Sequence, residues 1–165
     1  MATQILTQDL VRKLLDYNPD TGVFTHTKIR AGVTANSRAG ATHHLGYRTI
    51  YLLGKGFAEH RVAWLYVHGV WPAADLDHIN RVRSDNRLCN LREATRAQNC
   101  QNQPIRRSNK SGITGVYLHK ITGKWAASIN IEGKQKHLGL FVSIDAATQA
   151  RKLAELKYYP YGTTN

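Results

Sequence analysis

A polar, basic segment at residues 103–112 constrains the fold of this chain most strongly. It has no hydrophobic period, and it contains Pro104, Arg106, Arg107, Ser108, Asn109, Lys110, Ser111 and Gly112. Such composition is typical of a linker rather than of a packed helix or strand. The 165 residues fit one ordinary domain or two small ones. The linker favours two, at residues 1–102 and 113–165.

The first 102 residues predict short helices and strands in alternation. Apolar residues with helical spacing predict a helix over 7–17, capped by Thr7 and ended by a turn signal at 18–22. The elements expected after it are a strand at 22–27, a loop-like stretch at 29–44, a strand at 47–53 with a Gly54-Lys55-Gly56 turn, a helix at 59–68 ended by Gly69, and a helix from 92 or 93 to 102. A strand, a looped turn and a second short strand fit between residue 77 and the last helix.

Beyond the linker the pattern changes to alternation. The expected elements are strands at 113–118, 125–131 and 135–141, turns at 122–124 and 132–134, and a helix at 146–158 with Ser143 as N-cap. Val116 and Leu118 are expected to face the core. The helix face expected to do so consists of Ala147, Ala150, Leu153, Ala154 and Tyr158. Three antiparallel strands packed on one helix make an α+β module, and the expected fold class is α+β.

A formal net charge of +12 indicates a polyanionic partner. Like charges repel in the compact state, so this excess seldom serves stability, and nucleic acid is the commonest polyanion. A merely soluble basic protein is the alternative. Cys89 and Cys100 form no Cys-x-x-Cys pair, which excludes a four-Cys zinc site and fits a reduced cytoplasmic setting. No apolar run predicts a signal sequence or a membrane span.

The segment 77–99 carries the groups that phosphodiester cleavage needs. That reaction requires an activated water, a cation and donors that hold the phosphate. His78 is a candidate base, and Asp77 offers a hard oxygen ligand, with Asn99 as a further oxygen donor. Successive strand residues point to opposite faces. Asp77 and His78 therefore serve one site only if their strand ends or bends there.

The spacing in this segment resembles the HNH nuclease motif, or ββα-metal finger. Asn90 and Asn99 follow His78 by 12 and 21 positions. This pattern is similar to the phage and intron homing-endonuclease branch, in which Asn replaces the last His. Further matching pieces are Asp85-Asn86-Arg87, Asn90-Leu91-Arg92, His60-Arg61-Val62-Ala63-Trp64 and residues 17–24. The resemblance covers residues 5–102, with the motif itself at about 74–102.

The resemblance implies a role for each motif residue. His78 would be the general base, Asp77 and Asn99 would hold one divalent cation, and Asn90 would orient His78 or brace the loop through backbone hydrogen bonds. The implied cation is Mg²⁺, with Mn²⁺ or another divalent ion as alternatives. The implied activity is hydrolysis of double-stranded DNA, one strand per monomer, by a phage-encoded protein that acts in the bacterial cytoplasm as a monomer rather than a dimer.

Several basic residues are candidate phosphate contacts. They are Arg81, Arg83, Arg87, Arg92 and Arg96 in the motif, and Arg106, Arg107 and Lys110 in the linker. Arg92 and Arg96 are expected nearest the cleaved strand, and a solvated surface is the alternative for any one of them. His60 is either a partner of the site or a core histidine.

The C-terminal module resembles the DNA-binding domain of plant APETALA2 and ethylene-response factors. The matching pieces are Gly115-Val116-Tyr117, Lys124-Trp125-Ala126-Ala127, Leu138-Gly139-Leu140-Phe141 and Ala146-Ala147. The resemblance implies that the sheet lies in the DNA major groove and selects the site. Alternation predicts an outward polar face of Tyr117, His119, Lys124, Ser128, Asn130, Gln135 and His137. The plant domains place Arg at several of these positions, so their target sequence does not carry over.

Two other functions compete with the nuclease. A DNA-binding regulator could use an inactive HNH fold as scaffold, but Asp77, His78 and Asn99 are all present. An RNA-binding protein is a weaker alternative, since the chain lacks the paired aromatic motifs of single-strand RNA readers.

Overall fold

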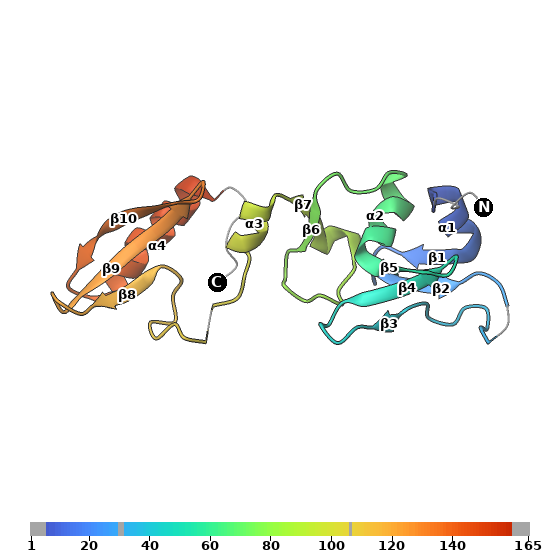
Figure 1. Cartoon of the computed structure of the whole chain (residues 1–165), viewed down its shortest axis with the longest axis horizontal. Helices are drawn as coiled ribbons and strands as arrows, with labels where there is room; N and C mark the ends of the chain where they lie inside the picture. The colour runs from blue at the N-terminus through green and yellow to red at the C-terminus, as the bar shows by residue number, and fades with distance from the viewer. Residues whose placement is uncertain (1–5, 30–31, 106, 160–165) are drawn as a thin grey trace. The chain divides into compact units, whose positions relative to one another are not determined.

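The computed structural model describes residues 6–29, 32–105 and 107–159. The chain divides into two compact units, and the boundary falls between Thr95 and Arg96. Figure 1 labels the elements of both. The predicted linker 103–112 contains no helix or strand among its described residues. None of the helices in the described ranges is long and apolar enough to cross a bilayer.

In its described residues, 6–29 and 32–95, the first unit consists of two α-helices and three small antiparallel sheets. Its elements are α1 (Gln8–Leu14), β1 (Leu15–Asn18), β2 (Val23–His26), β3 (Ala41–Thr42), β4 (Arg48–Leu52), β5 (Lys55–Ala58), α2 (Glu59–His68), β6 (Asp75–His78), the 3₁₀ turn η1 (Leu88–Asn90) and β7 (Leu91–Ala94). The sheets pair β1 with β2, β4 with both β3 and β5, and β6 with β7. The expected α+β class is confirmed.

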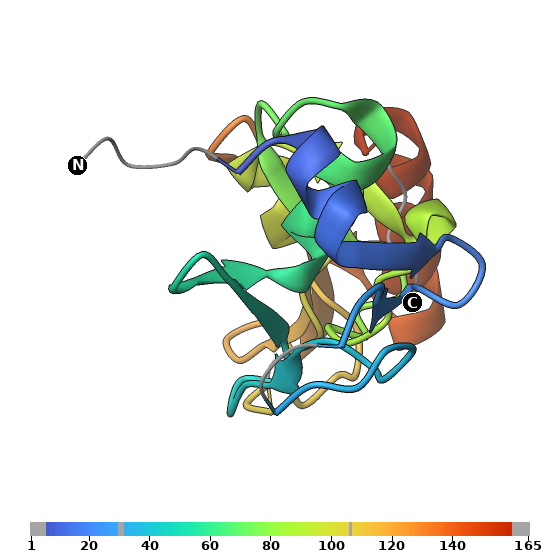
Figure 2. The ribbon, with the colours of Figure 1, turned by 90° about the vertical axis from the view of Figure 1, so that its right-hand side faces the viewer.

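The first helix is shorter than predicted, because a strand replaces its last turn. Thr7 caps α1 as expected, accepting a hydrogen bond from the Leu10 N–H at 3.4 Å. Leu15 and Tyr17 are buried while Asp16 and Asn18 are exposed, so the period of two overrides the helical spacing. β1 pairs with β2 over its whole length. Figures 1 and 2 show α1 running directly into β1.

The hairpin between β4 and β5 turns one residue earlier than predicted. Leu52 pairs with Lys55, which leaves Leu53 and Gly54 as the two turn residues, at φ 53° and 73°. A two-residue turn with both φ values positive matches the twist of the strands it joins. The stretch 29–44, predicted as a loop, contains the short strand β3, which pairs with β4.

α2 forms as predicted and lies in the core of the first unit. Gly69 ends it in left-handed backbone at φ 77°, which glycine adopts without steric cost. The core consists of Leu6, Val11, Leu15, Tyr17, Phe24, Ala39, Ile50, Leu52, Val62, Ala63, Leu65 and Leu91.

The segment around the motif is strand, loop, strand and helix, as expected. The helix predicted from 92 or 93 starts later, at α3 (Arg96–Gln101), and β7 occupies Leu91–Ala94. Leu91 and Ala94 are buried and lie opposite His78 and Asp75, so strand pairing overrides helix propensity here.

The second unit contains α3 and a three-stranded sheet covered by one helix. The strands β8 (Val116–His119), β9 (Lys124–Ile131) and β10 (Lys134–Phe141) form the order β10-β9-β8, and α4 (Ile144–Tyr158) packs on β9. The Ser143 hydroxyl caps α4 by accepting from the Ala146 N–H at 3.2 Å. Three predicted strands, one helix and its cap are confirmed.

Two apolar side chains predicted to be core residues of this unit are exposed. Leu118 is 51% and Leu153 is 68% exposed. Arg151 occupies part of the buried helix face instead. Its guanidinium donates to the Ser128 carbonyl and to Glu155 at 2.7 Å. A buried charge requires such partners, and this one links α4 to the middle of the sheet.

Gly115 and Gly123 offer a matched pair for testing this contact. Both have positive φ, 78° and 64°, but a Cβ on Gly115 would overlap the Ser128 carbonyl and the Arg151 guanidinium, whereas one on Gly123 meets nothing within 4 Å. We expect both alanine variants to lose about 1–2 kcal/mol from left-handed backbone, and Gly115→Ala a further ~1–3 kcal/mol from overlap. Urea unfolding followed by circular dichroism measures the difference, and equal losses would contradict it.

Candidate active site

Asp77 and His78 lie at the point where strand β6 ends. Asp77 pairs with Arg92 and His78 with Leu91 across the hairpin, and the Ile79 N–H closes the ladder on the Asn90 carbonyl at 2.9 Å. Both side chains are buried, 6% and 4% exposed. Asp77 and His78 can serve one site only if their strand ends or bends at this point, and β6 does end there.

Asn90 braces the loop that leaves this strand. Its side-chain oxygen accepts from the Asn80 N–H at 2.9 Å, and its amide nitrogen donates to the Asp85 carbonyl at 2.8 Å. Of the two roles predicted for Asn90, this geometry matches loop bracing by backbone hydrogen bonds.

Asp85 gathers donors within the same loop. Arg87 donates to both of its carboxylate oxygens, at 2.8 and 2.6 Å, and the Asn80 amide donates to one at 2.6 Å. These hydrogen bonds, led by that from Arg87, lower the pKa of Asp85 to about 2. Asp85 is therefore ionised, and able to accept these hydrogen bonds, at any ordinary pH.

The turn between β1 and β2 packs against the same loop. The Tyr17 hydroxyl donates to the Asn86 carbonyl at 2.7 Å, and burial raises the pKa of this hydroxyl. The Leu88 N–H donates to the Pro19 carbonyl at 3.3 Å. Gly22 comes so close that a Cβ there would overlap the backbone of Asn86 and Arg87.

His78 contacts a chain of buried polar side chains that the motif search did not single out. Its Nε2 lies 3.0 Å from Asn86 Oδ1, and Asn86 Nδ2 donates to Glu59 Oε1 at 3.1 Å. Glu59 Oε2 accepts from Arg48 Nε at 2.9 Å. Asn86 stood in a quoted motif piece, but Glu59 resembled an ordinary acidic residue in the first turn of a helix.

Two other rings, those of His60 and Tyr47, lie close to the His78 ring. The ring of His60 lies 5.1 Å and that of Tyr47 5.9 Å from the His78 ring, and the Arg83 guanidinium lies over Tyr47 at 5.0 Å. His60 Nδ1 is buried and has no hydrogen-bond partner among the described residues. Burial, with the nearby His78 and Arg61, lowers the pKa of His60 to about 4. His60 is therefore neutral at pH 7 and packs directly on the candidate base.

The carboxylate of Asp77 forms an ion pair. Arg92 donates to its Oδ2 through Nη2 at 3.0 Å and through Nε at 3.1 Å. Arg92, which was predicted to contact phosphate, thus forms an ion pair with Asp77, the predicted metal ligand. Asn99 lies on α3, in the second unit, and is half-buried.

The donors available for a cation are few. Among the described residues no group of three or more His, Cys, Asp or Glu side chains is placed to hold a metal ion. One carboxylate and one amide are hard oxygen donors, which suits an ion that keeps waters and takes its other ligands from phosphate. The residue types fit Mg²⁺ or a similar cation, and the ligand roles of Asp77 and Asn99 stay predictions.

The predicted phosphate contacts differ in their surroundings. Arg83 donates to the Leu45 carbonyl at 2.8 Å, and Arg87 and Arg92 hold carboxylates. Arg81 is half-buried in left-handed backbone at φ 64°. Arg96, Arg107 and Lys110 are exposed, as are Arg83 and Arg87, while Arg106 lies outside the described residues.

The register of the β10-β9-β8 sheet places the residues predicted to contact DNA bases on one face. Directly opposed pairs share a face, and the pairs here are Tyr117 with Ala126, His119 with Lys124, Ser128 with His137, and Asn130 with Gln135. Ser128 is an exception to the predicted exposure. It is 5% exposed because its hydroxyl accepts from the Gln135 amide at 3.1 Å and donates to the Gly115 carbonyl at 3.4 Å.

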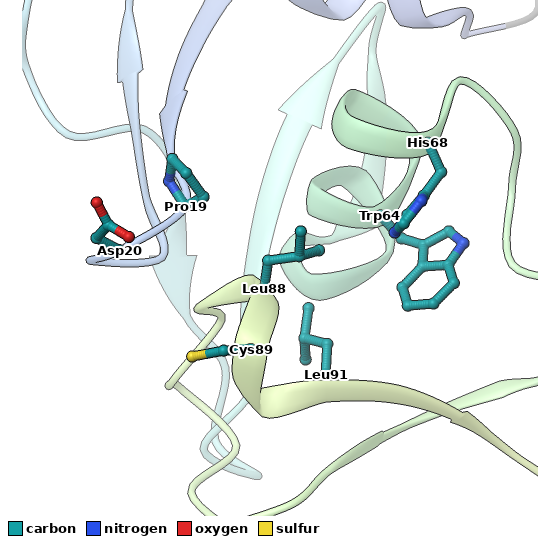
Figure 3. Close-up of a pocket in the computed structure, with 7 residues that line it drawn as sticks. All are labelled: Pro19, Asp20, Trp64, His68, Leu88, Cys89 and Leu91. Carbon is teal, nitrogen blue, oxygen red and sulfur yellow. The ribbon is translucent and has the colours of Figure 1, made fainter.

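A pocket in the first unit has a lining that excludes the candidate base and its neighbouring carboxylate (Figure 3). Its lining residues are Pro19, Asp20, Trp64, His68, Leu88, Cys89 and Leu91, with the Trp64 and His68 rings 4.2 Å apart. Neither Asp77 nor His78 lines it, so the pocket is not the centre of the candidate site.

Residues 57–101 match the model of the HNH endonuclease family. This HNH segment runs from β5 through α3 and includes Glu59, Asp77, His78, Asn86, Asn90 and Asn99. The match supports the nuclease part of the sequence prediction. HNH nucleases act on DNA and generally use a divalent metal ion. No curated protein and no solved structure matches the chain significantly, and the APETALA2 resemblance stays a prediction.

The lowered pKa of His60 predicts a pH dependence of stability. The unfolded chain binds a proton on this ring below about pH 6.5, whereas the folded chain does so only near pH 4. Stability should therefore fall between pH 6.5 and 4, by up to about 1.4 kcal/mol per pH unit. We expect His60→Phe to flatten this fall in urea titrations at several pH values. His137→Gln, at an exposed histidine, is the control and should unfold with the wild-type pH dependence.

Proposed function

We propose that this chain is a metal-dependent DNA endonuclease of the homing type. It hydrolyses one DNA strand per monomer, at a site selected by its C-terminal unit. The observation that carries the proposal is a buried histidine at the end of β6, next to a carboxylate, inside the HNH segment. The proposed origin is a phage genome, and the proposed place of action is the cytoplasm of the bacterial host.

His78 activates the attacking water in this proposal. Its imidazole takes the proton of a water aligned with the scissile phosphorus. Asp77 and Asn99 would hold one divalent cation, and we propose Mg²⁺ in preference to Mn²⁺. The cation would stabilise negative charge on the phosphorane-like transition state and on the leaving oxygen. Asn90 keeps the loop closed behind the base.

In this proposal Arg92 pairs with Asp77 in the free protein and with phosphate in the DNA complex. It balances the charge of Asp77 in the free protein, as the ion pair shows. A cation held by the carboxylate would repel the guanidinium, and Arg92 would then donate its parallel N–H groups to the phosphate instead. Arg92 therefore remains a phosphate contact in the proposal, acting once substrate is bound.

The second unit reads the target in this proposal. Its outward sheet face carries exposed amides and aromatic rings around the small, buried residues Ala126 and Ser128. Such a shallow polar face can approach base edges in a major groove. Arg96, Arg107 and Lys110 are exposed and contact phosphates without reading sequence.

The role of His78 is tested by substitution. His78→Ala should lower the rate of supercoiled-plasmid nicking in Mg²⁺ or Mn²⁺ by about 10²–10⁴-fold, because it removes the general base. DNA binding, measured by gel shift in Ca²⁺, should change little. His44→Ala, at an exposed histidine, should cut like the wild type. Undiminished cutting by His78→Ala would overturn the proposal, and binding without metal-dependent cutting by the wild type would favour the regulator.

The reading role of the sheet is tested on its neutral face residues. Asn130→Ala and Gln135→Ala should each weaken preference for the mapped cleavage site by about 1–3 kcal/mol per lost base contact. The salt dependence of binding, about −0.9 in log K per log salt for each phosphate neutralised, should not change, because no charge is removed. Gln149→Ala, exposed on α4, is the control. Unaltered site preference in both variants would place recognition elsewhere.

A further inference from the structure

Four buried side chains from separate segments form one chain of hydrogen bonds that ends on the candidate base. It runs from Arg48 on β4 through Glu59 on α2 and Asn86 in the loop to His78 on β6. All four are 9% exposed or less, and Glu59 is fully buried. Burial at this level is costly unless each polar group is paired, so the direction of each hydrogen bond is strongly specified.

The direction starts at the arginine, because a guanidinium can only donate. Arg48 donates to Glu59 Oε2, and its other nitrogen, Nη2, donates to the carbonyls of Ala39 and Gly40 at 3.1 and 2.9 Å. The carboxylate of this ion pair can only accept, so it receives the Asn86 amide on Oε1.

This arrangement leaves Asn86 one orientation. Its NH₂ group points to Glu59, and its carbonyl oxygen therefore points to His78 Nε2, 3.0 Å away. A carbonyl oxygen only accepts, so Nε2 must carry the hydrogen. In a neutral imidazole one nitrogen is protonated and the other holds the lone pair, which places the lone pair on Nδ1.

We propose that Glu59 and Asn86 are positioning residues that hold His78 in the Nε2–H tautomer and so select Nδ1 as its basic nitrogen. This inference rests on the proposed role of His78 as general base. The pair also orients the ring, and the charge of Glu59, relayed by the Asn86 dipole, stabilises the imidazolium that forms when His78 takes a proton.

The backbone just before β3 accommodates this arrangement. Gly40 has φ 76°, and a Cβ there would lie 2.9 Å from Glu59 Oε2. The close approach of this backbone to the carboxylate, at positive φ, needs a glycine.

The first measurement is the tautomer of His78 in the metal-free wild-type protein. Long-range ¹⁵N–¹H correlation spectra in alkaline buffer, where ordinary imidazoles are neutral, distinguish protonated Nε2 from protonated Nδ1. The signal is assigned with His78→Ala. We expect Nε2–H, and Nδ1–H in the wild type would overturn the proposal before any variant is made.

Glu59→Gln should reverse the chain. The new amide oxygen takes the place of Oε2 beside Arg48, so its NH₂ group faces Asn86. Asn86 then turns its oxygen to this donor and its own NH₂ to His78, and the proton moves to Nδ1. We expect the Nδ1–H tautomer and a loss of about 10²–10⁴-fold in kcat, the range of general-base catalysis, with KM little changed.

The double variant Glu59→Gln with Asn86→Asp should restore the wild-type direction. The new amide donates to the new carboxylate, which accepts from His78 Nε2, and the total charge is unchanged. We expect the Nε2–H tautomer and recovery of at least tenfold in kcat over Glu59→Gln. No recovery of the tautomer in a folded double variant would overturn the proposal.

Glu155→Gln is the matched control, because it also removes a carboxylate from a buried arginine, in the second unit. It should leave the His78 spectrum and kcat unchanged, and an altered His78 tautomer there would refute a local role for Glu59. The spectra need neither metal nor DNA, so they separate two failures. If His78→Ala cuts normally, the proposed function fails, while the tautomer still reports whether the chain of hydrogen bonds exists.

Discussion

The buried ion pair between Arg48 and Glu59 ties together the parts of the first unit that hold the candidate site. It joins β4 to α2, and through the carbonyls of Ala39 and Gly40 it joins both to the segment before β3. A buried ion pair contributes little net stability, but removing one partner typically costs about 3–5 kcal/mol. The observed arrangement of the three segments pairs each nitrogen of the Arg48 guanidinium with an oxygen acceptor, so displacing any one of the segments would leave a buried donor unpaired.

The sequence predicted the motif well because its spacing is a local property. A strand, a loop and a returning strand fix where Asp77, His78 and Asn90 lie relative to one another. Asp77 and His78 are the last two residues of β6, so their positions follow from where that strand ends. The role of Glu59 could not be predicted from the sequence, because its contacts are not local. Its partners, Arg48 and Asn86, come from distant segments, and an acidic residue in the first turn of a helix has an ordinary explanation in the helix dipole.

Two of the errors in secondary structure, a strand taken for part of a helix in each case, share one physical cause. Residues 15–18 and 91–94 carry apolar residues that fit either a helix or a strand, and a partner strand decides between them. In the second unit the strands, turns and N-cap were predictable because their alternation and turn residues are local. The exposure of Leu118 and Leu153 was not, since a three-stranded sheet and one helix have too small an interior for every apolar residue that alternation assigns to it.

The contacts of β1 and the turn after it, at residues 17–22, bear on how the HNH segment can be handled as a module. Tyr17, Pro19 and Gly22 support the loop around Asn86 from outside residues 57–101, and Arg48 does the same for Glu59. A fragment cut at the limits of the family match would retain every residue of the motif but lose the backbone and side-chain partners that shape it. The transferable piece is thus the whole first unit together with α3, which carries Asn99, and an alignment limited to the motif understates the sequence on which the site depends.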